Sequence, residues 1–230
     1  MIYKDAKLLC FSPHPDDVEF GLGGLLNRYR DMVTCYIVVF SDRNSTRGEK
    51  HNERDQLRAA ELLGVPPENV FFIDQLPGKD KSFQRVAIQY FAQEDHRARI
   101  RQVLSHCVKT FEPTVVFVPS VNETMQDHRA VGEEAVRVLR GNYDIYGYEV
   151  PKHNRNFRPN AFVELNSGDI QAKVAALNCY SEFTTRYYFD HKALESLAYV
   201  RALDAGFLGL VEAFEVYRIF SAQQAHGGRC

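Results

Sequence analysis

The sequence predicts an α/β protein built on a mostly parallel β-sheet with helices on both faces. Short apolar runs alternate along the first two thirds of the chain with longer segments whose apolar residues recur every three or four positions. The short runs are apolar throughout, which is typical of strands covered on both faces. The composition agrees with a folded globular chain, since 45% of the 230 residues are hydrophobic and 25% are charged.

The first part of the chain supplies most of the expected sheet. We expect strands at 8–11, 33–40, 70–73 and 115–118, because these runs are apolar and partly β-branched. Helical spacing of apolar residues predicts helices at 21–30, 52–63 and 96–109, and a further helix that starts at His128. Gly64 and the Pro66-Pro67 pair end the second of these helices. This order of elements predicts a Rossmann-like three-layer sandwich.

The last part of the chain, residues 141–230, has a less regular pattern. We expect strands at 161–165 and 211–219, and helices at 170–179 and 194–203, with Asp169 as the cap of the first helix. Neither an internal repeat nor a low-complexity linker separates this part from the rest. The sequence therefore predicts a single domain over residues 1–230, with 141–230 as its extension.

Charge and composition argue against several classes of function. The 28 Lys and Arg against 30 Asp and Glu give a net charge of −2, whereas binding to nucleic acid needs a concentrated positive face. The most apolar stretch, 35–40, is far shorter than the ~20 residues of a membrane span, and the N-terminus lacks the pattern of a signal peptide. Five widely spaced cysteines without a Cys-x-x-Cys pair are typical of reduced thiols. We therefore expect a cytoplasmic protein with no membrane span and no nucleic-acid partner.

A polar cluster follows the first expected strand directly. The segment Ser12-Pro13-His14-Pro15-Asp16-Asp17-Val18-Glu19 places one imidazole and three carboxylates at the end of that strand, where ligands bind in open parallel sheets. Its two prolines restrict the backbone and lower the entropic cost of holding a ligand. The alternative is a polar loop that caps the next helix through Asp16 or Asp17.

A second cluster, 122–131, follows the strand that ends at Val118, and we expect it at the same edge of the sheet. Two histidines and one carboxylate with an open position are typical of a catalytic zinc site, and His14, Asp17 and His128 can supply them. Asp16 would then remain beside the ion as a general base. The same ligand types also suit iron and other divalent metals.

These residues resemble the motifs of a known family. His14-Pro15-Asp16-Asp17, the later Gly23-Gly24 and the pair Asp127-His128 are similar to the PIG-L/LmbE family of zinc-dependent N-acetylglucosaminyl deacetylases, over most of 7–140. The resemblance implies that His14, Asp17 and His128 bind the metal and that Asp16 is the general base. It also implies that Arg54 contacts the substrate and that Asp127, beside the last ligand, has a supporting role.

The chain departs from the family pattern at Met125, where relatives usually have a histidine. In relatives that histidine is thought to stabilise the tetrahedral intermediate or to protonate the leaving amine. A thioether has no acidic proton and is only a weak acceptor, so Met125 can do neither. His153 and His226 are candidates for a replacement.

The sequence thus predicts a metal-dependent hydrolase, with Zn²⁺ as the expected metal, that removes an N-acetyl group from a small amino sugar or its conjugate. Two alternatives stay open: a metal- and sugar-binding member with weak or no deacetylase activity, and an amidase for a different acyl group. A dinucleotide site is not expected, because Leu26 stands where a Gly-x-Gly-x-x-Gly fingerprint needs its last glycine. The sugar and the oligomeric state, a homo-oligomer included, are left open.

Overall fold

The computed structural model of the chain describes residues 2–41, 49–85, 91, 93–152, 155–181, 184 and 186–220, with the backbone alone at 49–51. Its described strands form one seven-stranded sheet in the order β3-β2-β1-β4-β5-β7-β6. The strands are β1 (Ala6–Ser12), β2 (Val33–Val39), β3 (Val70–Phe72), β4 (Val115–Pro119), β5 (Asp144–Tyr148), β6 (Ala161–Leu165) and β7 (Leu210–Arg218). The first five are mutually parallel, whereas β7 is antiparallel to both β5 and β6. The predicted mostly parallel sheet is confirmed.

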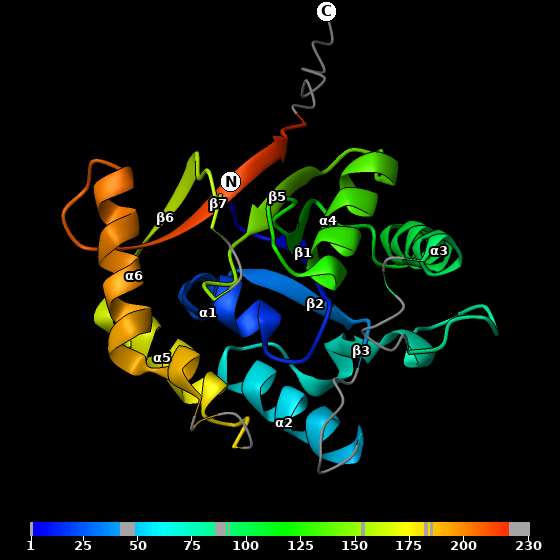
Figure 1. Cartoon of the computed structure of the whole chain (residues 1–230), viewed down its shortest axis with the longest axis horizontal. Coiled ribbons are helices and arrows are strands. Elements are labelled where there is room, and N and C mark those ends of the chain that lie inside the picture. Colours follow the sequence, from blue (N-terminus) through cyan, green and yellow to red (C-terminus); the bar gives the residue numbers. More distant parts are fainter. Residues whose placement is uncertain are drawn as a thin grey trace, which may run out of the picture.

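Helices cover both faces of this sheet (Figure 1). They are α1 (Asp17–Tyr29), α2 (Glu49–Leu62), α3 (Glu94–Phe111), α4 (Gln126–Val138), α5 (Ser167–Leu177) and α6 (His191–Asp204), with short 3₁₀ turns at Pro67–Asn69, Ile73–Gln75 and Tyr187–Phe189. Helices α3 and α4 lie on one face, and α1, α2, α5 and α6 lie on the other. The result is the three-layer α/β arrangement that the sequence predicts. None of the described helices is both long and apolar enough to span a membrane.

Each face of the sheet has its own hydrophobic core. Along β1 the side chains of Leu8 and Cys10 enter the core beneath α1 and α2, while Leu9 and Phe11 enter the core beneath α3 and α4. This alternation is the period of two that a pleated strand imposes. All four side chains have no exposed surface, which explains why the strand reads as one continuous apolar run.

Close packing of α1 against the last strands explains one glycine of the Gly23-Gly24 pair. A Cβ atom at Gly24 would lie 2.4 Å from Cδ1 of Leu165 on β6, so no larger residue fits without movement. The backbone N–H groups of Gly24 and Leu25 donate to the buried carboxylate of Glu212 on β7 at 2.9 and 2.6 Å. The chain beyond residue 140 therefore joins the same sheet and holds the first helix in place.

The cap of α5 differs from its prediction. Asn166, not Asp169, is the N-cap residue, and its side chain accepts the N–H of Asp169 at 3.0 Å. Asp169 accepts the N–H of Asn166 in return at 2.8 Å, which completes a capping box. The helix therefore starts three residues earlier than the apolar periodicity indicates.

The described cysteines agree with the prediction of reduced thiols. Cys10, Cys35, Cys107 and Cys179 are all free, and the first three are buried. Cys10 and Cys35 stand on neighbouring strands with their Sγ atoms 3.7 Å apart. Burial raises the pKa of the Cys107 thiol, as expected for an unreactive cysteine in a core.

Candidate metal centre and active site

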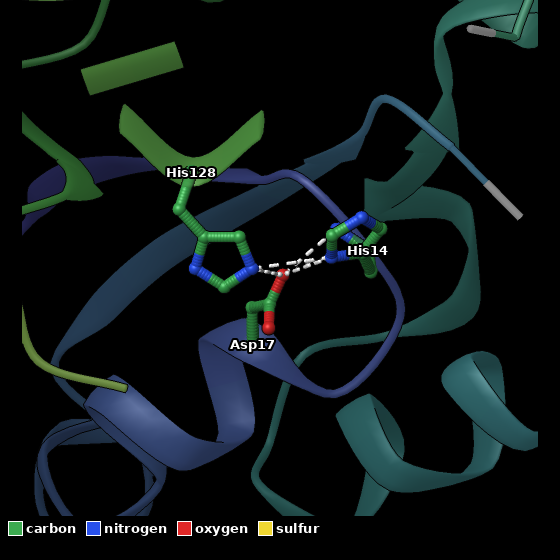
Figure 2. A group of neighbouring side chains, drawn as sticks. All are labelled: His14, Asp17 and His128. Carbon is green, nitrogen blue, oxygen red and sulfur yellow. Dashed lines mark hydrogen bonds and ion pairs between the residues drawn. The ribbon is translucent and has the colours of Figure 1, made fainter. Parts of the chain in front are cut away.

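Three side chains, from the loop after β1 and from the first turns of α1 and α4, converge on one point at the carboxyl edge of the sheet. Nδ1 of His14 lies 3.2 Å from Oδ2 of Asp17 and 3.2 Å from Nε2 of His128. The third side of the triangle, from Nε2 of His128 to Oδ2 of Asp17, is 3.3 Å (Figure 2). These are the three residues that the sequence predicts as ligands, and the structure brings them together.

The spacing of these three atoms fits a bound divalent ion. Ligand atoms around a tetrahedral zinc with bonds of about 2.0–2.1 Å are about 3.3–3.4 Å from one another. The three side chains are almost completely buried, and among the described residues they form a cluster of donor atoms that could hold a metal. Two imidazole nitrogens and one carboxylate oxygen are also the donor types that zinc prefers. The residues present therefore fit the metal that the sequence predicts.

The adjacency of β1 and β4 produces this convergence. The two strands pair in parallel, with Leu8 opposite Val115 and Cys10 opposite Phe117, so their carboxyl ends lie side by side. The loop after β1 carries His14, and the loop after β4 leads into α4, whose first turn contains His128. Parallel pairing thus places two loops that are distant in sequence at one sheet edge.

The loop after β1 is braced by its own polar groups. The hydroxyl of Ser12 donates to the carbonyl of His14 at 2.6 Å, and the N–H of His14 donates to Oδ2 of Asp17 at 2.8 Å. The side chain of Asp16, at the N-cap position of α1, makes no capping hydrogen bond. The structure therefore does not support the alternative in which Asp16 serves as the helix cap.

Asp16 has a strained backbone. Its φ angle is 89°, in the left-handed region that non-glycine residues enter only at a cost, and the residue has no exposed surface. The carbonyl of Asp16 accepts the N–H of Phe20 at 2.9 Å. Strain of this kind persists only where the surroundings hold it, and it is typical of functional sites.

Asp127 connects the two histidines of the cluster. Its Oδ2 lies 2.7 Å from Nε2 of His14, and its Oδ1 accepts the backbone N–H of His128 at 2.9 Å. A carboxylate on the second nitrogen of a ligand histidine fixes the orientation and tautomer of the ring. Asp127 thus contacts the ring of His14, in addition to preceding His128 in the sequence.

Burial and charge have opposite effects on the pKa values of His14 and Asp127. Burial lowers the pKa of His14, but hydrogen bonds and charges from Asp127 and Asp17 outweigh it and raise that pKa to about 9. Burial raises the pKa of Asp127, but the bond and charge of His14 outweigh it and lower that pKa to about 2. The pair is therefore an ion pair near neutral pH in the metal-free protein.

Glu123 is a buried carboxyl group that the sequence prediction missed. Its Oε2 lies 4.0 Å from Nδ1 of His128, and its Oε1 accepts the N–H of Val150 at 3.3 Å. Burial, together with the charges of Asp17, Glu149 and Asp127, raises the pKa of Glu123 to about 9. The residue stands inside the second polar cluster, but nothing in the sequence distinguishes it from a surface glutamate.

Glu215 on β7 anchors the loop that carries Glu123. The hydroxyl of Ser120 and the amide of Asn122 donate to its carboxylate at 2.6 and 2.8 Å. The backbone N–H of Arg158 donates to the same carboxylate at 2.9 Å. Glu215 is almost fully buried, so these donors compensate the cost of burying its charge.

The other predicted residues occupy different surroundings. Arg54 is on the exposed side of α2, where its guanidinium lies 3.6 Å from the carboxylate of Asp55. Met125 is half-buried at the N-cap position of α4 and makes no capping bond through its side chain. His153 and His226, the candidate replacements for the missing histidine, lie outside the described residues.

Residues 9–139, more than half of the chain, match the model of the PIG-L family, which is described as GlcNAc-PI de-N-acetylase. The chain belongs to the PIG-L family. The match covers the loops and helices that carry His14, Asp17, Asp127 and His128. The resemblance stated from the sequence motifs is thereby confirmed.

Other PIG-L and LmbE-like proteins are similar over most of the chain. A curated relative, the uncharacterized deacetylase YaiS of Escherichia coli K12, is 24% identical over 186 residues, which cover 76% of this chain and 90% of YaiS. The N,N'-diacetylchitobiose deacetylase of Pyrococcus horikoshii is 20% identical with a TM-score of 0.66, and the match covers 94% of this chain and 86% of that enzyme.

The same fold also occurs in an enzyme of a different class. GalB, the 4-carboxy-2-hydroxymuconate hydratase of Pseudomonas putida, is 16% identical with a TM-score of 0.65, over 95% of this chain and 99% of GalB. At these identities, structural similarity shows the fold alone. The chemistry of this chain must therefore be argued from the residues of its own site.

Proposed function

We propose that this PIG-L family member is a metal-dependent hydrolase that removes an N-acetyl group from an amino sugar or an amino-sugar conjugate, with zinc as the metal. The observation that carries the proposal is the buried triangle of donor atoms from His14, Asp17 and His128. Asp16, whose backbone is strained, precedes Asp17 in the sequence and adds a further carboxylate. Membership of a deacetylase family supports the same reaction.

Each residue of the site has a role in this reaction. His14, Asp17 and His128 would hold the ion, and a zinc ion bound there would polarise an amide carbonyl and lower the pKa of water. Asp16 accepts the proton of the attacking water and returns it to the nitrogen of the leaving amine. Asp127 keeps the ring of His14 in the orientation that aims Nδ1 at the triangle. The products are acetate and a free amine.

Met125 bears on the rate of this reaction. Loss of one donor that stabilises the tetrahedral intermediate typically costs about 10²–10³ in turnover. Met125 therefore favours a slow catalyst in which Asp16 carries the proton in both directions. A metal- and sugar-binding role, or hydrolysis of a different acyl group, are the alternatives that the tests below separate.

The metal site is tested by elemental mass spectrometry of purified protein after incubation with zinc. We expect about one ion per chain in the wild type and a large loss in His128→Ala. His191→Ala is the matched control, because His191 is exposed at the start of α6. A wild-type chain without bound metal after this incubation would contradict the proposal.

The reaction is tested by the release of acetate from a panel of N-acetylated amino sugars, with formyl and propionyl analogues included. We expect Asp16→Asn to reduce kcat by about 10²–10⁴ while zinc content stays unchanged. Asparagine tolerates the left-handed conformation of position 16, so this variant should fold. Near wild-type turnover in Asp16→Asn would rule out the base role, and preferred release of another acid would favour the amidase alternative.

A further inference from the structure

The strained backbone at Asp16 needs a partner to hold it, and α2 supplies one. The N–H of Asp16 donates to Oε1 of Gln56 in a long hydrogen bond of 3.4 Å. Both residues have no exposed surface, so the amide has no access to water. Separating a buried N–H from its acceptor is costly, which gives this contact a role in keeping Asp16 in place.

Gln56 is itself held in one orientation. Its Nε2 donates to Oε1 of Glu19 at 2.6 Å, and Glu19 is also completely buried. This bond assigns the two ends of the Gln56 amide, because the nitrogen faces Glu19 and the oxygen faces Asp16. Gln56 thus bridges the residue before α1 and the first turn of that helix.

We propose that Gln56 is a positioning residue for Asp16, with its own amide oriented by Glu19. The proposal rests on the proposed function, in which Asp16 moves the proton. Gln56 reaches across from α2 to the backbone of Asp16, and the contacts described for its side chain include none to His14, Asp17 or His128. Its effect should therefore fall on the carboxylate that moves the proton and spare the ion.

Accurate placement matters more here than in relatives with two acid–base groups. Met125 cannot transfer a proton, and in the proposed function Asp16 carries both transfers. A displacement of about 1 Å in a reacting group can reduce the rate about 10²-fold. We therefore expect loss of the Gln56 bridge to lower kcat and to leave KM and zinc content nearly unchanged.

The test compares three variants on α2. Gln56→Met keeps the length of the side chain but removes both hydrogen bonds, whereas Gln56→Glu keeps an acceptor for the N–H of Asp16. Glu61→Met is the control, because it introduces the same side chain at an exposed position of the same helix. We expect kcat to fall about 10- to 100-fold in Gln56→Met, to recover in part in Gln56→Glu, and to stay unchanged in Glu61→Met.

A second readout does not depend on activity. Hydrogen exchange of the Asp16 amide, measured by NMR relative to the core amide of Val38 on β2, should be at least tenfold faster in Gln56→Met than in the wild type. Unchanged exchange at Asp16 would overturn the proposal, and so would unchanged kcat in an active enzyme. If the wild type hydrolyses no acylated amine, the proposed function fails, and the exchange rate still decides whether Gln56 holds Asp16.

Discussion

Oδ2 of Asp127 lies 2.7 Å from Nε2 of His14, although 113 positions separate the two residues in the sequence. The same carboxylate accepts the backbone N–H of His128 through its other oxygen. One buried side chain thus sets the ring orientation of one candidate ligand and the backbone position of another. The geometry of the candidate metal centre therefore depends on α4 for the placement of both His14 and His128.

Replacing Asp127 should therefore weaken metal binding before it affects the fold. We expect Asp127→Asn to lower zinc affinity about 10- to 100-fold, because outer carboxylates of this kind orient the ligand histidine and raise its basicity. Competition with a chromophoric chelator measures the affinity. Asp31→Asn, at an exposed position, is the control, and equal affinities for Asp127→Asn and the wild type would show that the contact has no such role.

Restoring a histidine at position 125 should accelerate the reaction. Met125 is half-buried at the start of α4, one turn before His128, so a ring at this position lies on the same end of the helix as the metal centre. We expect Met125→His to raise kcat about tenfold or more, up to the 10²–10³ typical of one stabilising donor. Steady-state acetate release measures it, with the exposed Met32→His as control. No gain in the variant would favour the binding role of the wild-type chain.

Glu19 should make the metal-free protein less stable as pH rises. Burial, and secondarily the charge of Asp16, raise the pKa of Glu19 from 4.5 to about 8 in the folded state. Between these values the native state holds a proton that the unfolded state has lost, so stability falls as pH increases. The raised pKa of His14 adds a slope of the same sign between pH 6.5 and about 9.

The variant Glu19→Gln isolates the first of these contributions. Glutamine keeps an acceptor for the amide of Gln56 but has no proton to lose, so the variant should gain stability over the wild type as pH rises from 5 to 8. The gain should be on the order of a few kcal/mol. Urea unfolding at several pH values measures the gain. If the free energy of unfolding changed with pH in the same way for both proteins, Glu19 would not titrate in this range.

The fold was largely predictable because its strands are apolar on both faces. Runs such as Leu8–Phe11 need no knowledge of partners to be recognised as buried strands. β5 was missed because Asp144-Ile145-Tyr146-Gly147-Tyr148 mixes glycine and polar residues, and its neighbours β4 and β7 decide its pairing. The start of α1 at Asp17 was also missed, since the polar residues of its first turn hide the helical pattern.

The convergence of the candidate site residues was predictable because they follow closely after parallel strands. His14, Asp16, Asp17 and His128 follow β1 and β4, whose adjacency places them at one edge. Glu19, Gln56 and Glu123 could not be assigned, because their roles arise from tertiary contacts that leave no spacing pattern.

The orientation of α2 bears on the predicted role of Arg54. Asn52, Gln56 and Ala59 are buried at helical spacing, and Arg54 lies between them in sequence but about 200° around the helix from Asn52. Its side chain is 58% exposed, so the periodicity of α2 already indicates a solvent-facing position. Contact between Arg54 and the substrate stays a prediction.

The donor atoms come from the segment 14–17 after β1 and from the first turn of α4, and these come together when β1 and β4 pair in their native register. A chain that binds its ion here is thus closed into a large ring through the metal, and only correctly assembled molecules form that ring. Ion binding then draws the population toward the native state, by about 2.7 kcal/mol at a free ion concentration a hundred times Kd. The lifetime of such a protein in a cell would follow the supply of that ion, and scarcity would expose it to proteolysis.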